Sequence, residues 1–474
     1  MRRGMMRSLP LASLLTIIVC VPVLAEDRPP NFVVILADDL GAGELGCYGN
    51  AEHRTPNLDR LASEGVKFET AFACTVCHPT RFEIMTGQYG HHNGVHNFAG
   101  SRGGPDVGGE GPDNIASHLT FAQVLKPRGY ATALAGKWQL SGEPPTLITE
   151  CGFDEYCTWG YRQYYSREDG RRAEEAGQDF RSRYWGPSII ENGRWRPTTI
   201  DDYGPDIFDD FVIDFVQRHK DEPFFVYYPM CLTHGPWVST PDTTASEADR
   251  TVKSQGNFAA NVEYMDKQVG RIAAALREAG VADNTVILFT GDNGTGFRGK
   301  SEAIELGARV PLIAHGPGIV RKRGSTLELA DLSDVMPTLA EMAGADLPAN
   351  VPIDGHSLAR FLTGESEATR EWIYAYQADR RVLRTKRWLL EDTSPLHYGR
   401  LFDCGGNRDG VGYRDVTDSM DAETLAAKKY FDELIAKLPV PYIATEGKPN
   451  DPKLPKDKRE ESGKKRRRSA DKND

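Results

Sequence analysis

Four short apolar runs along the chain each end in polar residues that could carry chemistry. Residues 31–37 run into Asp38-Asp39, residues 130–135 precede Gly136-Lys137-Trp138, residues 224–228 lead to Thr233-His234, and residues 285–290 precede Gly291-Asp292-Asn293. Nearly continuous apolar runs of this length predict strands in a sheet that is covered on both faces.

Helical patterns lie between these runs. Thr55 precedes Pro56 and an apolar stripe of Leu58, Leu61 and Ala62, which predicts a helix capped by Thr55. Further helices are predicted over residues 120–126, 257–279 and 332–343. Strands that alternate with helices predict an α/β fold with a mostly parallel sheet sandwiched by helices. In such folds ligands gather at the carboxyl ends of the strands, where the four polar groups would meet.

The pattern changes after about residue 365. Residues 372–376 and 381–390 are typical of short strands and residues 422–438 of a helix, which predicts a smaller C-terminal α+β subdomain. The expected organisation is a signal peptide (1–25), a catalytic domain (26–365), this subdomain (366–445) and a disordered basic tail (446–474).

The first 25 residues have the layout of a secretory signal peptide. Three arginines precede an apolar run over residues 9–24, and Ala25 offers a small residue at the cleavage position. A retained membrane anchor is the alternative, but the run is short and polar residues 26–28 follow it at once. We therefore expect an exported protein, periplasmic or extracellular, with no membrane partner.

The charge distribution argues against nucleic acid as a partner. The formal net charge is −11, but residues 1–25 carry +3 and residues 446–474 carry +4, so residues 26–445 carry −18. General nucleic-acid binding requires a basic face, which this body does not supply. The basic run 464–468 lies in a tail with almost no apolar residues, which is typical of a solvated, disordered end.

An odd number of cysteines remains once the predicted signal peptide is removed. They are Cys47, Cys74, Cys77, Cys151, Cys157, Cys231 and Cys404. Cys151 and Cys157 could pair, although sequence alone does not fix connectivity. In an exported protein an odd count suggests that one thiol has another task.

Cys77 is the candidate for that task. Cys74-Thr-Val-Cys77 alone would be typical of a redox pair or of half a zinc site. The pattern continues as Cys77-His-Pro-Thr-Arg81 and then Met85-Thr86-Gly87, and no second pair follows at zinc-finger spacing. This segment resembles the signature of the sulfatase family, Cys-x-Pro-x-Arg followed by Thr-Gly. The resemblance implies that a maturation enzyme oxidises Cys77 to formylglycine.

The resemblance extends from Asn31 to about residue 440, with the family's motifs in the family's order. They are the paired aspartates, Gly-Lys-Trp, Thr-His, Asp-Asn-Gly, and Lys300 ahead of Arg309-Val310-Pro311. It implies a formylglycine-dependent, arylsulfatase-like type I sulfatase with the alkaline-phosphatase-like fold.

Asp38, Asp39, Asp292 and Asn293 supply hard oxygen ligands of the kind that Ca²⁺ or Mg²⁺ prefers. Any one of them alone would be more typical of a solvated or helix-capping residue. The family resemblance favours Ca²⁺ and adds residue 77 to the ligands.

The resemblance also implies the catalytic roles. Hydrated formylglycine at position 77 would attack sulfur, and Arg81 would hold the nucleophile and the nearby carboxylates. Lys137 and Lys300 would contact sulfate oxygens as point charges. His234 would protonate the leaving oxygen, a task suited to imidazole.

One position departs from the family pattern. The family commonly reads Gly-Lys-Trp-His-Leu, whereas this chain has Gln139 at the histidine position. Glutamine can donate a hydrogen bond to sulfate or to the nucleophile, but it cannot carry a proton. Trp237 could stack on a sugar ring or pack in the core. His91, His92 and His96 could line a substrate pocket, form an adventitious metal cluster or be solvent-exposed.

The sequence therefore predicts a sulfuric ester hydrolase that acts on sulfated glycans, with small aryl sulfates as surrogate substrates. Specificity would come from residues 88–118 and the Arg/Tyr-rich residues 155–205. Two alternatives stay open: a phosphodiesterase or phosphonate hydrolase of the same fold, and a sulfated-glycan binder without turnover, which Gln139 motivates. The complete signature and the single-metal ligand set favour the sulfatase.

Overall fold

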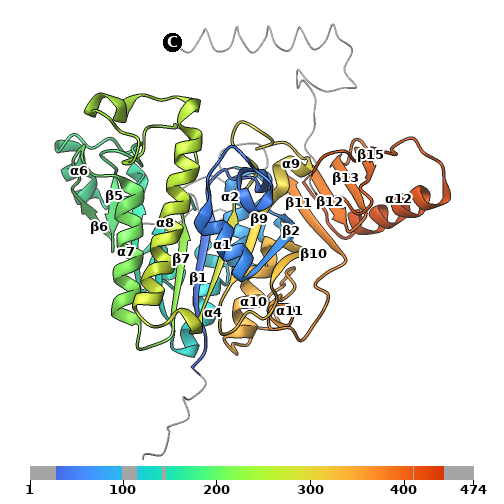
Figure 1. Ribbon diagram of the computed structural model, residues 1–474, viewed down its shortest axis with the longest axis horizontal. Coiled ribbons are helices and arrows are strands. Elements are labelled where there is room, and N and C mark those ends of the chain that lie inside the picture. Colours follow the sequence, from blue (N-terminus) through green and yellow to red (C-terminus); the bar gives the residue numbers. More distant parts are fainter. Residues whose placement is uncertain (1–27, 99–114, 141–145, 409, 442–474) are drawn as a thin grey trace, which may run out of the picture.

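The computed structural model describes residues 28–98, 115–140, 146–408 and 410–441. The predicted signal peptide and basic tail lie outside these residues. The described chain forms a ten-stranded sheet between helices and a separate five-stranded antiparallel sheet (Figure 1). The predicted fold class, an α/β layer structure with a smaller C-terminal α+β part, is confirmed. The domain boundaries at residues 365 and 445 stay predictions.

The centre of the large sheet is parallel. Its strand order is β10 (Gly324–Asp331), β2 (Val66–Phe72), β9 (Arg309–His315), β8 (Thr285–Gly291), β1 (Asn31–Ala37), β7 (Phe224–Pro229), β3 (Ala131–Gly136), β4 (Glu155–Trp159), β5 (Ile189–Glu191) and β6 (Arg194–Arg196). The five neighbours from β8 to β4 all run in one direction, whereas β9, β5 and β6 run antiparallel to their neighbours. The four strands predicted from the apolar runs therefore end at one edge.

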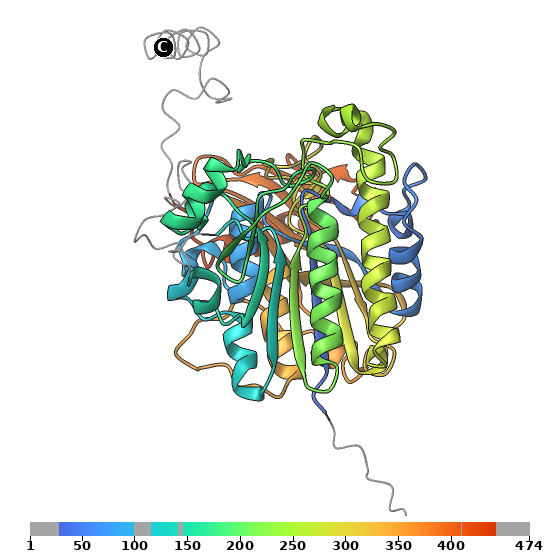
Figure 2. The ribbon, with the colours of Figure 1, turned by 90° about the vertical axis from the view of Figure 1, so that its left-hand side faces the viewer.

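Both faces of the sheet are buried because successive side chains of a strand point to opposite sides. Val33 and Ile35 of β1 belong to an apolar cluster with α1 (Pro56–Glu64), α7 (Gly204–His219) and α8 (Phe258–Glu278), and Figure 2 shows α7 and α8 lying side by side over that face. Val34 and Leu36 pack towards the opposite helices, which are α2 (Cys77–Thr86), α4 (Phe121–Leu125), α5 (Leu147–Glu150), α10 (Val335–Met342) and α11 (Ala359–Leu362). This two-sided burial accounts for the continuous apolar runs.

The start of α1 corrects one prediction. Pro56 is the first helical residue as expected, but the Thr55 hydroxyl does not cap the helix and instead donates to Asp59 at 3.0 Å. Asp266 of α8 replaces it, because its carboxylate accepts the backbone N–H groups of Asn57 at 3.1 Å and Leu58 at 2.8 Å. The cap comes from a residue far away in the sequence, which a local pattern does not reveal.

The C-terminal part packs on the edge of the large sheet. It consists of β11 (Trp372–Gln377), β12 (Arg380–Thr385), β13 (Trp388–Thr393), β14 (Arg400–Asp403), β15 (Arg414–Asp415) and α12 (Ala422–Ile435). A turn at residues 386–387 divides the predicted strand region 381–390 into two strands. Ile373 and Ala375 of β11 share an apolar cluster with Phe72 of β2, so the small sheet is fixed beside the edge where the parallel strands end. Among the described residues, no helix has the length and apolarity needed to cross a membrane.

Candidate active site

The signature segment forms helix α2, which begins at Cys77 and ends at Thr86. Cys77 is 2 % exposed and Arg81, one turn later, is fully buried. Gly87 ends the helix with a left-handed backbone (φ 68°), where a Cβ atom would meet Ile353 at 3.2 Å. The Thr-Gly of the signature is therefore the helix terminator, and the Cys-to-Arg spacing places both side chains on the inner side.

Three carboxylates and one amide meet at the carboxyl ends of β1 and β8. Asp38, Asp39, Asp292 and Asn293 are all buried. The backbone N–H of Asp39 donates to Asp292 Oδ1 at 2.9 Å, and Asn293 Nδ2 donates to Asp39 Oδ1 at 2.9 Å. The predicted metal ligands are thus brought together by two neighbouring parallel strands.

Three cationic side chains neutralise this cluster. Lys137 Nζ lies 2.8 and 2.6 Å from the two oxygens of Asp38, and Lys300 Nζ lies 2.6 and 2.8 Å from those of Asp39. Arg81 donates to Asp292 Oδ2 at 2.7 Å and to the backbone oxygen of Lys137 at 2.8 Å. Arg81 therefore fixes the position of Asp292 relative to the backbone of Lys137.

Burial and the cations divide the carboxylates into two kinds. Burial disfavours the charged form of Asp38, but the surrounding positive groups, Lys137 first among them, together outweigh it and hold the pKa of Asp38 far below its ordinary value. Burial, reinforced by the charge of Asp38, raises the pKa of Asp292 to about 7. A cation bound beside Asp292 would favour its charged form.

The donor set fits a hard divalent cation. Asn293 Oδ1 is buried and has no hydrogen-bond partner among the described residues, although its amide nitrogen is bonded. Oxygens of Asp38 and Asp39 lie within 4.8 Å of one another and of a nitrogen of His234. A cluster dominated by carboxylate and amide oxygens is typical of Ca²⁺ or Mg²⁺ rather than of a softer metal.

A cavity of about 520 Å³ opens in front of this cluster. Five residues predicted for catalysis or binding line it, namely Cys77, Lys137, Gln139, His234 and Lys300. The other lining residues are Val76, Asn97, Phe98, Tyr161, Arg183, Ser301 and Gln377, none of which the sequence analysis singled out. Arg81 lies behind the lining, against the carboxylates.

His234 reaches the cavity with one free nitrogen. Its Nδ1 lies 2.6 Å from the backbone oxygen of Gly235, so Nδ1 carries the proton and Nε2, 3.6 Å from Asp39 Oδ2, carries the lone pair. Burial lowers the pKa of His234 to about 4, so the resting imidazole is neutral. The Arg183 guanidinium is stacked 4.3 Å from the centre of the Trp159 ring and approaches His234 Nδ1 at 3.3 Å.

The profile of the Sulfatase family matches residues 30–345, about two thirds of the chain. The chain belongs to the sulfatase family. Human arylsulfatase A is 33 % identical over 74 % of this chain and 71 % of its own length. Human N-acetylgalactosamine-6-sulfatase is 30 % identical over 70 % of this chain and 65 % of its own length. The crystal structure of Ps i-CgsB in complex with k-i-k-neocarrahexaose superposes with a TM-score of 0.71 at 25 % identity, covering 89 % of this chain and 96 % of that one.

Membership of this family makes the protein a sulfuric ester hydrolase. In this sulfatase the unusual Gln139 lines the cavity. Its backbone oxygen accepts a hydrogen bond from His78 Nδ1 at 3.0 Å, whereas its side-chain Oε1 is buried and has no partner in the described chain. Gln139 Oε1 is therefore an acceptor that the described chain leaves unused.

Two further sequence-based readings are not supported by the geometry. The sulfatase has Cys74 as a free thiol that donates to Glu83 Oε2 at 3.0 Å, so Cys74 and Cys77 are not a disulfide redox pair. Cys151 and Cys157 are also free.

Trp237 is not part of the cavity lining. Its ring packs edge-on against Phe258 and Phe297, with ring centroids 5.8 and 5.3 Å away, and its Nε1 donates to the Thr233 backbone at 2.8 Å. This packing corresponds to the structural alternative for Trp237 rather than to the sugar-stacking one.

Arg183 is the functional candidate that sequence reasoning missed. It lies in the Arg/Tyr-rich region 155–205, which was expected to set specificity, but nothing in that region distinguishes it from its neighbouring arginines. Gln377 was missed for a different reason: it comes from β11 of the small sheet, which only the tertiary fold brings to the cavity.

Proposed function

We propose that this sulfatase hydrolyses sulfate esters of glycans, with residue 77 as the nucleophile after its conversion to formylglycine. The observation that carries the proposal is the position of Cys77, at the first residue of a buried helix and in a cavity shared with Lys137, Lys300 and His234. Burial raises the pKa of the Cys77 thiol, although the two lysines act against it. An unmodified thiol is therefore a poor nucleophile here, whereas a hydrated aldehyde supplies hydroxyl groups.

The lysines recognise the sulfate group. Lys137 is 1 % exposed, and the side chain of Lys300 is 18 % exposed. Because water is largely excluded, each ammonium group interacts more strongly with a bound anion than it would in solvent. Gln139 adds an amide that can donate to a sulfate oxygen.

Asp38, Asp39, Asp292, Asn293 and residue 77 would hold a Ca²⁺ ion, with Mg²⁺ as the alternative. When bound, the ion supplies positive charge next to the sulfate and lowers the pKa of a nearby hydroxyl group. Arg81 keeps Asp38 and Asp292 in place, at 3.5 and 2.7 Å from its Nη2.

His234 handles the leaving-group proton. Its Nε2 carries the lone pair in the resting state because Nδ1 donates to the Gly235 backbone. A bound sulfate anion beside the imidazole raises its pKa from the resting value of about 4, which allows protonation at Nε2. Gln139 cannot share this task, so His234 acts as general acid without a second histidine at that position.

A second groove supports an oligosaccharide rather than a small aryl sulfate as the natural substrate. This groove has a volume of about 850 Å³ and adjoins the catalytic cavity at Arg183, which lines both. Trp185, Trp195, Arg250 and Lys253 contribute to its walls. Indole rings stack on sugar faces and basic groups bind sulfate or carboxylate, so the groove suits an anionic glycan.

Sulfate release tests the proposal. The mature protein, made in a host that installs formylglycine, should release sulfate from 4-nitrophenyl sulfate and from members of a panel of sulfated oligosaccharides, with Cys77→Ala as the inactive control. Trp195→Ala should lower kcat/KM for the oligosaccharide and leave the aryl sulfate unchanged. Binding of oligosaccharides without turnover would favour a non-catalytic binder, and faster cleavage of phosphodiesters or phosphonates would favour the other hydrolase class.

The place of action follows from the predicted signal peptide. We propose that the enzyme is exported and meets its substrate in the periplasm or outside the cell. Recovery of Glu26 as the N-terminal residue of the secreted protein would support this, and an uncleaved N-terminus in a cytoplasmic fraction would contradict it.

A further inference from the structure

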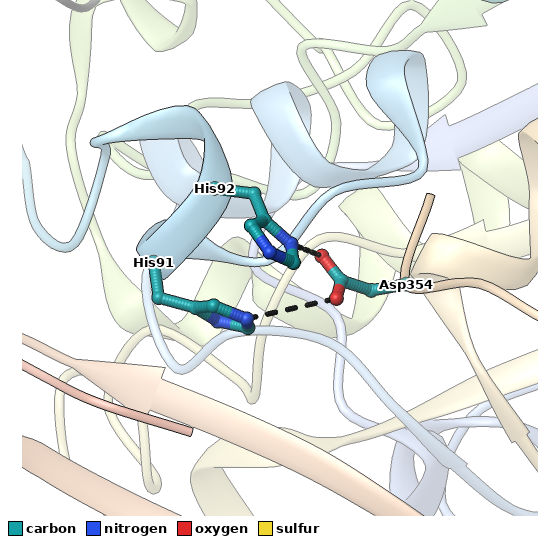
Figure 3. A group of neighbouring side chains, drawn as sticks. All are labelled: His91, His92 and Asp354. Atoms are coloured by element: carbon teal, nitrogen blue, oxygen red, sulfur yellow. Dashed lines mark hydrogen bonds and ion pairs between the residues drawn. The ribbon is translucent and has the colours of Figure 1, made fainter. Parts of the chain in front are cut away.

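Two histidines and an aspartate gather outside the catalytic cavity (Figure 3). His91 and His92 belong to the short helix α3 (Gly90–Asn93), which follows the signature helix, and Asp354 lies between α10 and α11. His92 Nδ1 is 2.8 Å from Asp354 Oδ2 and His91 Nε2 is 3.7 Å from Asp354 Oδ1. The three donor atoms all lie within 4.8 Å of one another.

The backbone fixes this arrangement from both sides. The N–H of Tyr89 donates to Asp354 Oδ2 at 2.7 Å, and the N–H of Asp354 donates to the carbonyl oxygen of Gly87 at 2.8 Å. The aspartate is therefore held by the same segment that carries the two histidines. Such fixed donor atoms lose little freedom when a ligand binds between them.

Hydrogen bonding explains only half of the cluster. His92 makes a normal hydrogen bond to the carboxylate, whereas His91 Nε2 faces the other carboxylate oxygen at 3.7 Å, beyond hydrogen-bond length. His91 Nδ1 is buried and has no hydrogen-bond partner among the described residues. The centre of the His91 ring lies 4.0 Å from that of the His92 ring, and His91 Nε2 points at the Asp354 carboxylate without a hydrogen bond. This arrangement suits a cation between His91 Nε2 and the carboxylate.

We propose that His91, His92 and Asp354 form a binding site for a divalent transition metal of the zinc class. Two imidazoles and one carboxylate are a common three-residue zinc set, with water as the fourth ligand. Zinc bonds of about 2.0–2.2 Å place neighbouring tetrahedral ligands about 3.3–3.5 Å apart. This spacing lies between the 2.8 and 3.7 Å that separate the histidine nitrogens from the Asp354 oxygens. Ca²⁺ prefers oxygen ligands and belongs to the Asp38–Asp39 cluster instead.

The bound ion links two segments beside the catalytic cavity. It joins α3 to the connection between α10 and α11, and Asn97 and Phe98 of the cavity lining follow α3 within a few residues. The His92 side chain is 36 % exposed, so an ion can enter from solvent. Zinc binding should therefore raise the thermal stability of the protein.

Cobalt titration tests the site, because Co²⁺ replaces Zn²⁺ and absorbs visible light when it is bound by imidazole. The mature protein is saturated with Ca²⁺ and then titrated with Co²⁺, and the same is done for His91→Gln/His92→Gln and for the control His219→Gln on α7. We expect one Co²⁺ equivalent in the wild type and in the control, and its loss in the double variant. Zn²⁺ should raise the melting temperature only in the first two.

Binding of the same equivalent by a folded double variant would overturn the proposal, as would the absence of any bound Co²⁺ at micromolar concentration in the wild type. X-ray absorption of the zinc-loaded wild type does not depend on the variant folding. Two imidazole ligands in the spectrum support the site, and an all-oxygen shell contradicts it.

Discussion

Replacement of Lys300 by methionine separates sulfate recognition from folding. Lys300 Nζ lies 2.6 and 2.8 Å from the oxygens of Asp39 and its side chain lines the catalytic cavity. Burial lowers the pKa of Lys300, but the negative groups around it, Cys77 and the three aspartates of the cluster, together raise it above its ordinary value, so the ammonium stays charged at neutral pH. Methionine is shorter by only the terminal nitrogen, so it keeps most of the side chain and removes the charge and its hydrogen bonds.

The expected catalytic loss is large and the expected loss of stability is moderate. Removal of one group that stabilises developing negative charge costs about 10²–10³ in kcat, or about 3–4 kcal/mol. The charge-assisted bonds to Asp39 contribute about 1.5–3 kcal/mol to folding, and Asn293 Nδ2 still donates to Asp39 at 2.9 Å in the variant. The fold should therefore survive the substitution.

The assay is steady-state hydrolysis of 4-nitrophenyl sulfate at saturating Ca²⁺, with the melting temperature measured on the same samples. Lys267→Met is the matched control, because its ammonium group pairs with Asp242 at 2.6 Å on the surface and contributes less than about 1 kcal/mol. The control should keep full activity. A loss of less than about tenfold in a Lys300→Met protein that is still folded at the assay temperature would refute the assigned role.

Three further perturbations have defined outcomes. Burial raises the pKa of Glu391 to about 7 from 4.5, so the stability that the protonated carboxyl contributes is present below about pH 4.5 and is lost as the pH rises through 7. Glu391→Gln should abolish this pH dependence in denaturation experiments and raise the free energy of unfolding by up to about 3 kcal/mol at pH 8. Arg370→Met should cost about 3–5 kcal/mol in urea unfolding, because Asp334, 2.8 Å from the guanidinium, and Asp331 are left buried without their cation; a cost below about 1 kcal/mol would contradict this. Chelation of Ca²⁺ should abolish turnover and lower the melting temperature, and Ca²⁺ should restore both; full activity after exhaustive chelation would exclude the proposed metal role.

The sequence predicts the fold well where burial dictates local composition. The predicted strand 31–37 has the bounds of β1, and β7 and β8 each extend one residue beyond the predicted strands 224–228 and 285–290. The agreement is close because strands covered on both faces have to be apolar throughout. Parallel pairing of these strands then brings Asp38, Asp292 and the segment of His234 to one edge, as the general rule for α/β folds predicts.

Long-range packing accounts for what the sequence does not reveal. Arg183 and Gln377 reach the cavity from segments whose own periodicity gives no sign of the site. Trp237 follows His234 closely, yet it is held among phenylalanines because Phe297 comes from the loop after β8. The contact of His91 with Asp354 joins residues more than 260 positions apart, which no local spacing encodes.

The mass of the tryptic peptide that contains Cys77 tests the central claim most directly. The protein is made in a host with a formylglycine-installing enzyme. Cys74 lies on the same tryptic peptide and is a buried free thiol, so it serves as an internal control that should not be converted. We predict an aldehyde at position 77 and a thiol at position 74. A thiol at both positions, while another sulfatase is converted in the same cells, would contradict the proposed mechanism.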